Sequence, residues 1–328
     1  MNLLVITRLL DPLKLQDENL QLQVPIPGLN FRGALVNAFL QYQCPYSHYW
    51  CKEKKCDDYS KCFVPDELLQ EISKVSYGFI ICPSCDDQGF LIRTPSTWVI
   101  CKKCVRENEI SPTSYQIITE KDKCANCSSR ATLTALNSWI CNKCGSIPEK
   151  TIFQYSNTYI GIQQTNFSTE ESFLFEVPVL IPGYEIGFIV KTENDKFINF
   201  LQNMVGRYMN IGGGRSRGLG TLEIEDVSEI TLQKSQSDEI LFVTPASINK
   251  KKLGEFDQSK ITYNSGGVEK SNNWDSSIGE FTEYHHLITP GTVIHLDNIT
   301  VTGENSLIQD NNGLGGHINI KSLKEVTK

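Results

Sequence analysis

Apolar side chains fall into short blocks along the chain, and their spacing predicts the element that each block forms. Residues 3–10 are mainly aliphatic and predict a buried strand. Residues 31–40 and 195–209 repeat apolar side chains at helical spacing, so we expect a helix in each. Residues 156–191 predict three strands rich in β-branched and aromatic side chains, and residues 221–225 alternate like a half-buried strand. The order is close to the β-α-β-β-α-β succession of a ferredoxin-like fold.

The C-terminal third of the sequence is rich in strands and loops. Residues 239–244 and 291–301 predict strands, and the Asn/Ser/Gly-rich stretch 264–277 between them predicts a mobile connection. Residues 312–320 place a glycine-rich turn before a strand without any arginine. We interpret this region as a second, degenerate copy of the first fold. The alternative is an extension that only completes the first domain.

These patterns predict an α+β protein with three parts. A ferredoxin-like domain is formed by residues 1–43 and 150–233. A cysteine-rich insertion occupies residues 44–149, and a smaller β-rich domain occupies residues 234–328. A chain of 328 residues is long enough to bury a substantial core in such an arrangement.

A glycine-rich loop lies between the second predicted helix and the last predicted strand of the first domain. Glycine allows close backbone approach and positive φ, and arginine offers a planar donor for phosphate oxygens. This order differs from the strand-loop-helix order of a dinucleotide fingerprint, and the Lys-Ser/Thr ending of a P-loop is absent. The loop is therefore a candidate site for a phosphodiester backbone. The residues assigned to it are Gly212, Gly213, Gly214, Arg215, Ser216, Arg217, Gly218 and Gly220.

A second candidate anion site lies at the start of the first predicted helix. Asn30 is a candidate N-cap, so we expect Arg32 in the first helical turn. Free N–H groups in that turn favour an anion, and the guanidinium adds a bidentate donor. The alternative is an exposed helix residue without a ligand.

All 12 cysteines lie between Cys44 and Cys144, and eight of them form four Cys-x-x-Cys knuckles. Two consecutive knuckles joined by a short arm are typical of a zinc ribbon, in which four thiolates hold a closed, structural zinc ion. The sequence predicts two such sites. The first combines Cys82, Cys85, Cys101 and Cys104, and the second combines Cys124, Cys127, Cys141 and Cys144. A third site is a weaker hypothesis because the spacing of Cys44, Cys51, Cys56 and Cys62 is irregular.

Composition limits the classes of function. Hydrophobic residues make up 40% and charged residues 21%, and no apolar run approaches the length of a membrane span. The N-terminal residues lack the basic region and cleavage site of a signal peptide, so we expect a cytoplasmic protein without a membrane partner. The net charge of −7 argues against nucleic-acid binding by bulk positive charge but allows a local basic groove.

Two motifs together carry a family resemblance. They are the Pro-Gly-x-x-x-Arg-Gly helix start at residues 27–33 and the glycine-rich loop at residues 212–220. The strand succession at 157–162, 171–177 and 182–188 also fits. With these segments the chain resembles the repeat-associated mysterious proteins (RAMPs), the RNA-recognition-like subunits of CRISPR effector complexes. The position of the knuckles makes it most like the large type III-D member, which pairs this fold with a second copy.

The resemblance implies a CRISPR RNA-binding subunit of a type III RNA-guided effector complex in antiviral defence. Such a subunit grips the guide through its backbone, meets target RNA by way of the guide, and contacts other RAMP and large subunits. Its place is expected at or near the end that holds the repeat-derived tag. Arg215 and Arg217 would then neutralise phosphates, Arg32 would bind phosphate at the helix start, and Tyr208 is expected in the core.

Two enzymatic alternatives and one adaptor alternative stay open. Family members cut target RNA with an aspartate in the loop after the first strand, where Asp11 and Asp17 are the candidates for metal-dependent endoribonuclease activity. His285 and His286 would suit guide processing less well, since adjacent strand residues point to opposite faces. We favour a non-catalytic protein over both. Zinc ribbons alone would also allow an adaptor that binds only protein.

Overall fold

The structure is a computed structural model that describes most, but not all, of the chain. The described residues before the C-terminal segment are 1–15, 24–43, 74–101, 133–135, 138–148, 154–162, 169–212 and 218–231. The remaining described residues are 234–237, 239–248, 252–253, 256–257, 259, 261–271, 274–275, 280–281, 285–296, 301–304, 307 and 316–319. No helix in these ranges is both long enough and apolar enough to cross a membrane.

The chain divides into two compact units. Unit 1 comprises Met1–Gly78 and Ile152–Ile230, and unit 2 comprises Phe79–Thr151 and Thr231–Lys328. The cysteine-rich insertion and the C-terminal segment thus fall into one unit. Within unit 2, the amide of Ser96 donates a 2.8 Å hydrogen bond to the carbonyl of Gly291. The sequence predicted three parts, with the insertion and the C-terminal domain separate. That division is finer than the two units and stays a prediction.

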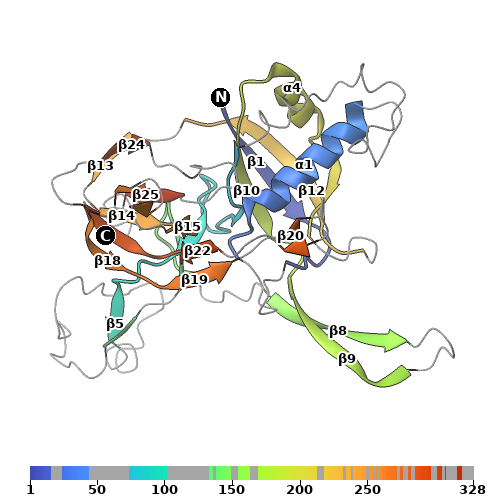
Figure 1. Cartoon of the computed structure of the whole chain (residues 1–328). Helices are drawn as coiled ribbons and strands as arrows, with labels where there is room; N and C mark the ends of the chain where they lie inside the picture. Colours follow the sequence, from blue (N-terminus) through green and yellow to red (C-terminus); the bar gives the residue numbers. More distant parts are fainter. Residues whose placement is uncertain are drawn as a thin grey trace. The chain divides into compact units, whose positions relative to one another are not determined.

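Unit 1 is built on an antiparallel sheet with the strand order β11-β12-β1-β10-β2. Figure 1 labels three of its strands, β1, β10 and β12. The central strand β1 is the aliphatic block at the start of the sequence, and it pairs with β10 on one side and β12 on the other. The elements of unit 1 are β1 (Asn2–Leu9), α1 (Gly28–Gln43), β2 (Lys74–Val75), β8 (Gln154–Ile162), β9 (Thr169–Leu180), β10 (Glu185–Lys191), α4 (Asp195–Asn203), β11 (Tyr208–Asn210) and β12 (Thr221–Glu229).

Both helices pack on one face of this sheet. Phe31 of α1 stacks on Phe188 of β10 with ring centroids 4.2 Å apart. Phe39, two turns further along α1, meets Phe197 and Phe200 of α4 at 5.7 and 5.0 Å. The sheet residues on this face are fully or almost fully buried: Leu3, Val5, Thr7, Leu9, Ile186, Phe188, Val190, Leu222 and Ile224. On the opposite face Leu4, Ile6 and Ile189 are also buried, whereas Arg8 and Tyr208 near the loop end are exposed.

The second predicted helix is shorter than the sequence pattern indicates. α4 begins after the N-cap Asn194, whose side chain accepts a 3.1 Å hydrogen bond from the amide of Phe197. It ends at Asn203 rather than continuing to Met209, because Gly206 adopts φ +75° and the chain turns into strand β11. Val205 and Tyr208, which were predicted on the apolar stripe, are 46% and 61% exposed. The prediction of Tyr208 as a core residue is therefore wrong.

Unit 2 consists of small antiparallel sheets. Its principal sheet has the order β18-β23-β14-β25, and its core includes Phe242, Ile288 and Ile294. The stretch 264–277, predicted as a mobile connection, contains strand residues in its described part, and its mobility stays a prediction. The strands of unit 2 are β3 (Phe79–Ile80), β4 (Leu91–Arg93), β5 (Val99–Cys101), β6 (Leu133–Ala135), β7 (Trp139–Cys141), β13 (Lys234–Ser237), β14 (Glu239–Phe242), β15 (Ala246–Ser247), β16 (Lys252–Leu253), β17 (Phe256–Asp257), β18 (Ile261–Ser265), β19 (Val268–Ser271), β20 (Trp274–Asp275), β21 (Glu280–Phe281), β22 (His285–Ile288), β23 (Val293–Leu296), β24 (Val301–Glu304) and β25 (His317–Asn319).

Candidate functional site

The glycine-rich loop connects two strands rather than a helix and a strand. It follows the short edge strand β11 and leads into β12, which pair antiparallel with each other. Its central residues Gly213, Gly214, Arg215, Ser216 and Arg217 lie outside the described residues. Gly212, Gly218 and Gly220 are described and have φ values of +76°, +72° and +77°. These values lie in the left-handed region, which explains the choice of glycine at these positions.

Both ends of the loop are held against the segment that follows β1. The amide of Gly220 donates to the carbonyl of Pro12 at 2.9 Å, and the amide of Ile211 donates to the carbonyl of Gly220 at 2.9 Å. A Cβ at Gly212 would lie 2.5 Å from the carbonyl oxygen of Lys14, and a Cβ at Gly220 would overlap the carbonyl oxygen of Ile211. The loop therefore has a fixed base, and only glycine fits at its two ends.

The candidate aspartate Asp11 lies in the same segment, one residue before Pro12. It is partly exposed at the end of β1. Leu13, two residues further on, is buried and forms a bridge with Leu180 at the end of β9. The structure thus brings the segment of Asp11 and the base of the glycine loop together. Asp17 lies outside the described residues.

Arg32 is placed differently from the prediction. Helix α1 begins at Gly28, so Arg32 is its fifth residue and Asn30 lies inside the helix rather than at its N-cap. The unpaired N–H groups of a helix belong to its first turn, which ends before Arg32. The predicted combination of free N–H groups and guanidinium at this residue is therefore wrong, although the partly exposed side chain still lies near the helix start.

The exposed face of the sheet carries an ion-paired arginine beside the loop end. Arg8 of β1 lies 2.6 Å from a carboxylate oxygen of Glu225 and 3.3 Å from one of Glu185. The hydrogen bond to Glu225 and the charge of that carboxylate raise the pKa of Arg8. Since Arg8 already faces two carboxylates, it is a poor anchor for an additional phosphate.

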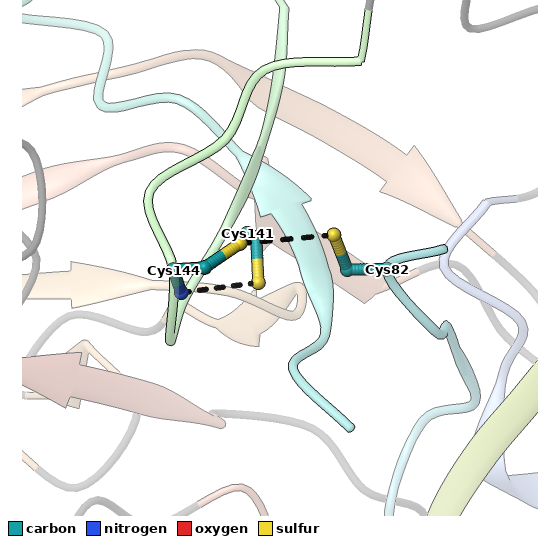
Figure 2. Close-up of side chains that lie close together, drawn as sticks. All are labelled: Cys82, Cys141 and Cys144. Carbon is teal, nitrogen blue, oxygen red and sulfur yellow. Dashed lines mark hydrogen bonds between the residues drawn. The ribbon is translucent and has the colours of Figure 1, made fainter. Parts of the chain in front are cut away.

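A second candidate site, in unit 2, is made of cysteines. The sulfurs of Cys82, Cys141 and Cys144 all lie within 4.8 Å of one another (Figure 2). The Cys82 and Cys144 sulfurs are 3.9 Å apart. Two thiolates bound tetrahedrally at about 2.3 Å from zinc would lie about 3.8 Å apart. The spacing therefore suits a tetrahedral metal ion.

Cys85 supplies a fourth sulfur next to this cluster. Gly89 lies beside both Cys85 and Cys141. A Cβ at Gly89 would overlap the sulfur of Cys141 and lie 3.1 Å from the sulfur of Cys85. The two sulfurs thus converge on the space that a side chain at Gly89 would fill. Four thiols from two knuckles match the donor set of a closed structural zinc site.

Hydrogen bonds shape the fourth knuckle, Cys141 to Cys144, in the manner expected around a metal thiolate. The amides of Lys143 and Cys144 donate to the Cys141 sulfur at 3.5 and 3.4 Å. Gly145 closes the turn with φ +69°, and its amide donates to the Cys141 carbonyl at 3.0 Å. The Ser146 hydroxyl lies 3.3 Å from the Cys82 sulfur and 3.0 Å from the Cys144 sulfur. These polar groups orient three of the four candidate ligands.

The thiols of this knuckle differ in acidity. Burial raises the pKa of Cys141, and the amides of Cys144 and Lys143 offset this only in part. Burial also opposes ionisation of Cys144, but hydrogen bonds, first of all from Ser146, outweigh it and lower its pKa to about 7. Cys144 is thus the thiol of this knuckle that ionises more readily near neutral pH.

The pairing of the knuckles corrects the sequence prediction. Cys82 and Cys141 were assigned to different sites, but the structure joins the first knuckle to the fourth. The reason is a nested antiparallel arrangement in which β4 pairs with β7 and β5 pairs with β6. Cys101 ends β5. The other predicted ligands, Cys104, Cys124, Cys127, Cys44, Cys51, Cys56 and Cys62, lie outside the described residues.

The histidine pair of the guide-processing alternative lies in unit 2. His285 and His286 are consecutive residues of strand β22, opposite Ser271 and Lys270 of β19. Because consecutive strand residues alternate between the two faces, the argument against a shared proton-transfer site stands.

Comparisons with known proteins identify the fold. No protein-family model and no curated protein matches the sequence. A chain in a type III-B Cmr-beta structure bound to cognate target RNA is similar, with 13% identity, 89% of this chain and 86% of that chain covered, and a TM-score of 0.52. The same complex with AMPPnP gives a TM-score of 0.50 at the same identity and coverage. The Csm3-Csm4 subcomplex of a type III-A CRISPR-Cas interference complex is similar over 95% of this chain and 97% of that chain, with 13% identity and a TM-score of 0.43. The predicted likeness to subunits of type III effector complexes is thus confirmed at the level of the fold.

Proposed function

We propose that this chain is a CRISPR RNA-binding RAMP subunit of a type III effector complex. Unit 1 supports this with the order β1, α1, β2, β10, α4, β12 and the sheet order β12-β1-β10-β2. This is the fourth-first-third-second arrangement that a ferredoxin-like, RNA-recognition-like domain adopts. The similar Cmr-beta structure is described as bound to cognate target RNA, which agrees with a place in an RNA-guided complex.

The observation that carries the proposal is the fixed base of the glycine-rich loop. The hydrogen bond from Gly220 to Pro12 ties the loop to the segment that follows β1, and the bond from Ile211 to Gly220 ties the two ends of the loop together. In the sequence, Arg215 and Arg217 lie between the glycines of this loop. A loop of this kind can follow a phosphodiester backbone closely and neutralise its charge. Sequence recognition is left to base pairing between guide and target, as in other guided effectors.

The test is the salt dependence of guide-RNA binding by Arg215→Ala with Arg217→Ala. If each arginine neutralises one phosphate, the slope of log K against log salt should become shallower by about 1.4, at about 0.7 per phosphate of a single strand. The matched control is Arg8→Ala, which removes an exposed arginine that two carboxylates already neutralise. Unchanged affinity and slope in the double variant would refute the proposal. A protein that copurifies without any RNA would support the adaptor alternative.

We further propose that the cysteine cluster of unit 2 holds a structural zinc ion. Cys82, Cys85, Cys141 and Cys144 would be its ligands, since soft thiolates in a closed tetrahedral set favour zinc. Such an ion would hold together two knuckles that lie far apart in the sequence. Its four thiolate ligands would leave no coordination position for a substrate. Metal analysis of the purified chain tests this, and a second or third zinc equivalent would come from the remaining eight cysteines.

A second candidate function is cleavage of target RNA at Asp11. The observation that favours it is that the segment of Asp11 braces the glycine loop, so a carboxylate lies on the segment next to the proposed RNA path. Target cleavage in the assembled complex should then be lost in Asp11→Asn and, by the same hypothesis, in Asp17→Asn. Cleavage that survives both substitutions would leave the non-catalytic role as the better account.

A further inference from the structure

An exposed aromatic ring lies on the sheet face of unit 1 that the helices do not cover. Tyr208 begins the edge strand β11 and is 61% exposed, whereas its neighbour Met209 is 3% exposed. Exposure of this extent is unusual for a tyrosine within a paired strand, because aromatic side chains normally contribute most when buried. The ring is therefore available to a ligand.

The backbone of this tyrosine is held firmly. Tyr208 lies opposite Glu223 of β12, and Asn210 lies opposite Thr221, whose hydroxyl donates a 3.1 Å hydrogen bond to the Asn210 side chain. The buried Met209 packs on the helical side of the same strand. A ring on such a strand is preorganised, so binding a flat partner requires little additional ordering.

Register places Tyr208 in a row with charged residues across the sheet. Glu223 lies opposite both Tyr208 and Arg8, and Arg8 lies opposite Glu185. Directly opposed residues of antiparallel strands share one face. With Arg8 neutralised by Glu225 and Glu185, the row has no spare positive charge for a phosphate. A neutral base can approach this face more readily than a phosphate can.

The strand of Tyr208 leads directly into the glycine-rich loop. Ile211 is buried and Gly212 begins the loop only four residues after Tyr208, about 13 Å along an extended strand. The proposed phosphate-binding element and the exposed ring are thus parts of one continuous segment.

We propose that Tyr208 is a stacking platform for a base of single-stranded RNA. This inference rests on the proposed RNA-binding function and adds to it the position of a base. Stacking of a base on an aromatic side chain contributes about 1–3 kcal/mol and tolerates any base. A subunit that holds guides of many sequences needs a contact of this kind.

The first test measures guide-RNA affinity of the full chain with Tyr208→Ala, Tyr208→Phe and Tyr42→Ala. Tyr208→Ala should weaken binding by about 5–150-fold, the factor that corresponds to 1–3 kcal/mol, without changing the salt slope. Tyr208→Phe should bind almost as well as the unchanged chain. Tyr42 is the matched control because it is 46% exposed but lies on α1, where Arg207 covers its ring at 5.5 Å.

The second test uses RNA that carries 5-iodouridine at successive positions, since photocrosslinking of this base favours stacked aromatic rings. One position should crosslink to Tyr208, and the crosslink should disappear in Tyr208→Ala. If the unchanged chain binds no RNA, the proposed function fails together with the stacking. If it binds RNA but Tyr208→Ala binds equally well and no crosslink forms, only the stacking proposal is overturned. Loss of a protein partner with unchanged RNA binding would identify a protein contact instead.

Discussion

The two glycines at the end of the glycine-rich loop offer a controlled test of how the loop is held. Gly218 and Gly220 have nearly equal φ values, +72° and +77°. An alanine in this region costs about 1 kcal/mol relative to glycine, so both substitutions share that term. A Cβ at Gly218 would meet no atom within 4 Å in the described part of the chain, whereas a Cβ at Gly220 would overlap the carbonyl oxygen of Ile211. Only Gly220→Ala must therefore move the backbone of the loop base.

The magnitude of the difference follows from the hydrogen bonds at Gly220. Moving this residue breaks the 2.9 Å bonds from its amide to Pro12 and from Ile211 to its carbonyl. At about 1 kcal/mol each, their loss adds about 2 kcal/mol to the shared term. We expect Gly220→Ala to destabilise the β11–β12 pairing by about 3 kcal/mol and Gly218→Ala by about 1 kcal/mol.

Native-state hydrogen exchange of the full chain measures this difference locally. The amide of Ile224, bonded to the carbonyl of Arg207 at 3.0 Å, reports opening of the pairing next to the loop. It should exchange about 30-fold faster in Gly220→Ala than in Gly218→Ala, the factor that corresponds to 2 kcal/mol. Equal exchange in the two variants would refute the argument that the loop base is held by these contacts.

Four further predictions concern the metal centre of unit 2 and helix α1 of unit 1. Cys82→Ser should remove one bound zinc equivalent per chain, measured by metal analysis, because three thiolates remain where four closed the site. Ser146→Ala should keep the metal but weaken its affinity by about 10–100-fold in a chelator competition, since its hydroxyl contacts two ligand sulfurs. Gly33→Ala should raise the stability of unit 1 by about 0.5–1 kcal/mol in denaturant unfolding, because glycine is a poor helix former. Gly33 is an exposed residue of α1, and an added Cβ would meet no atom of the described residues within 4 Å. Gly78→Ala should lower the stability of unit 1 by about 1–3 kcal/mol, since its Cβ would overlap the Phe31 ring. A Gly78→Ala chain as stable as the unchanged one would show that the ring moves away freely.

Local sequence patterns predicted the element types of unit 1 well. The aliphatic block at the start forms the central strand β1, and the three strands expected in residues 156–191 are β8, β9 and β10. Such patterns work because each strand or helix must turn a face of fixed period toward the core. The helix boundary near Gly206 was missed because the apolar spacing continues past a glycine that reverses the chain.

The sequence by itself determined the chemistry of both sites: arginines set among glycines, and thiols in Cys-x-x-Cys knuckles. Only the tertiary structure decided which groups meet. The first knuckle joins the fourth because β4 and β7 pair across nearly fifty residues, and the spacing of knuckles along the chain carries no information about that pairing. The bracing of the glycine loop by Pro12 and the exposure of Tyr208 depend in the same way on strand register between distant segments. Register is set by the packing of the whole sheet, so no local pattern encodes it.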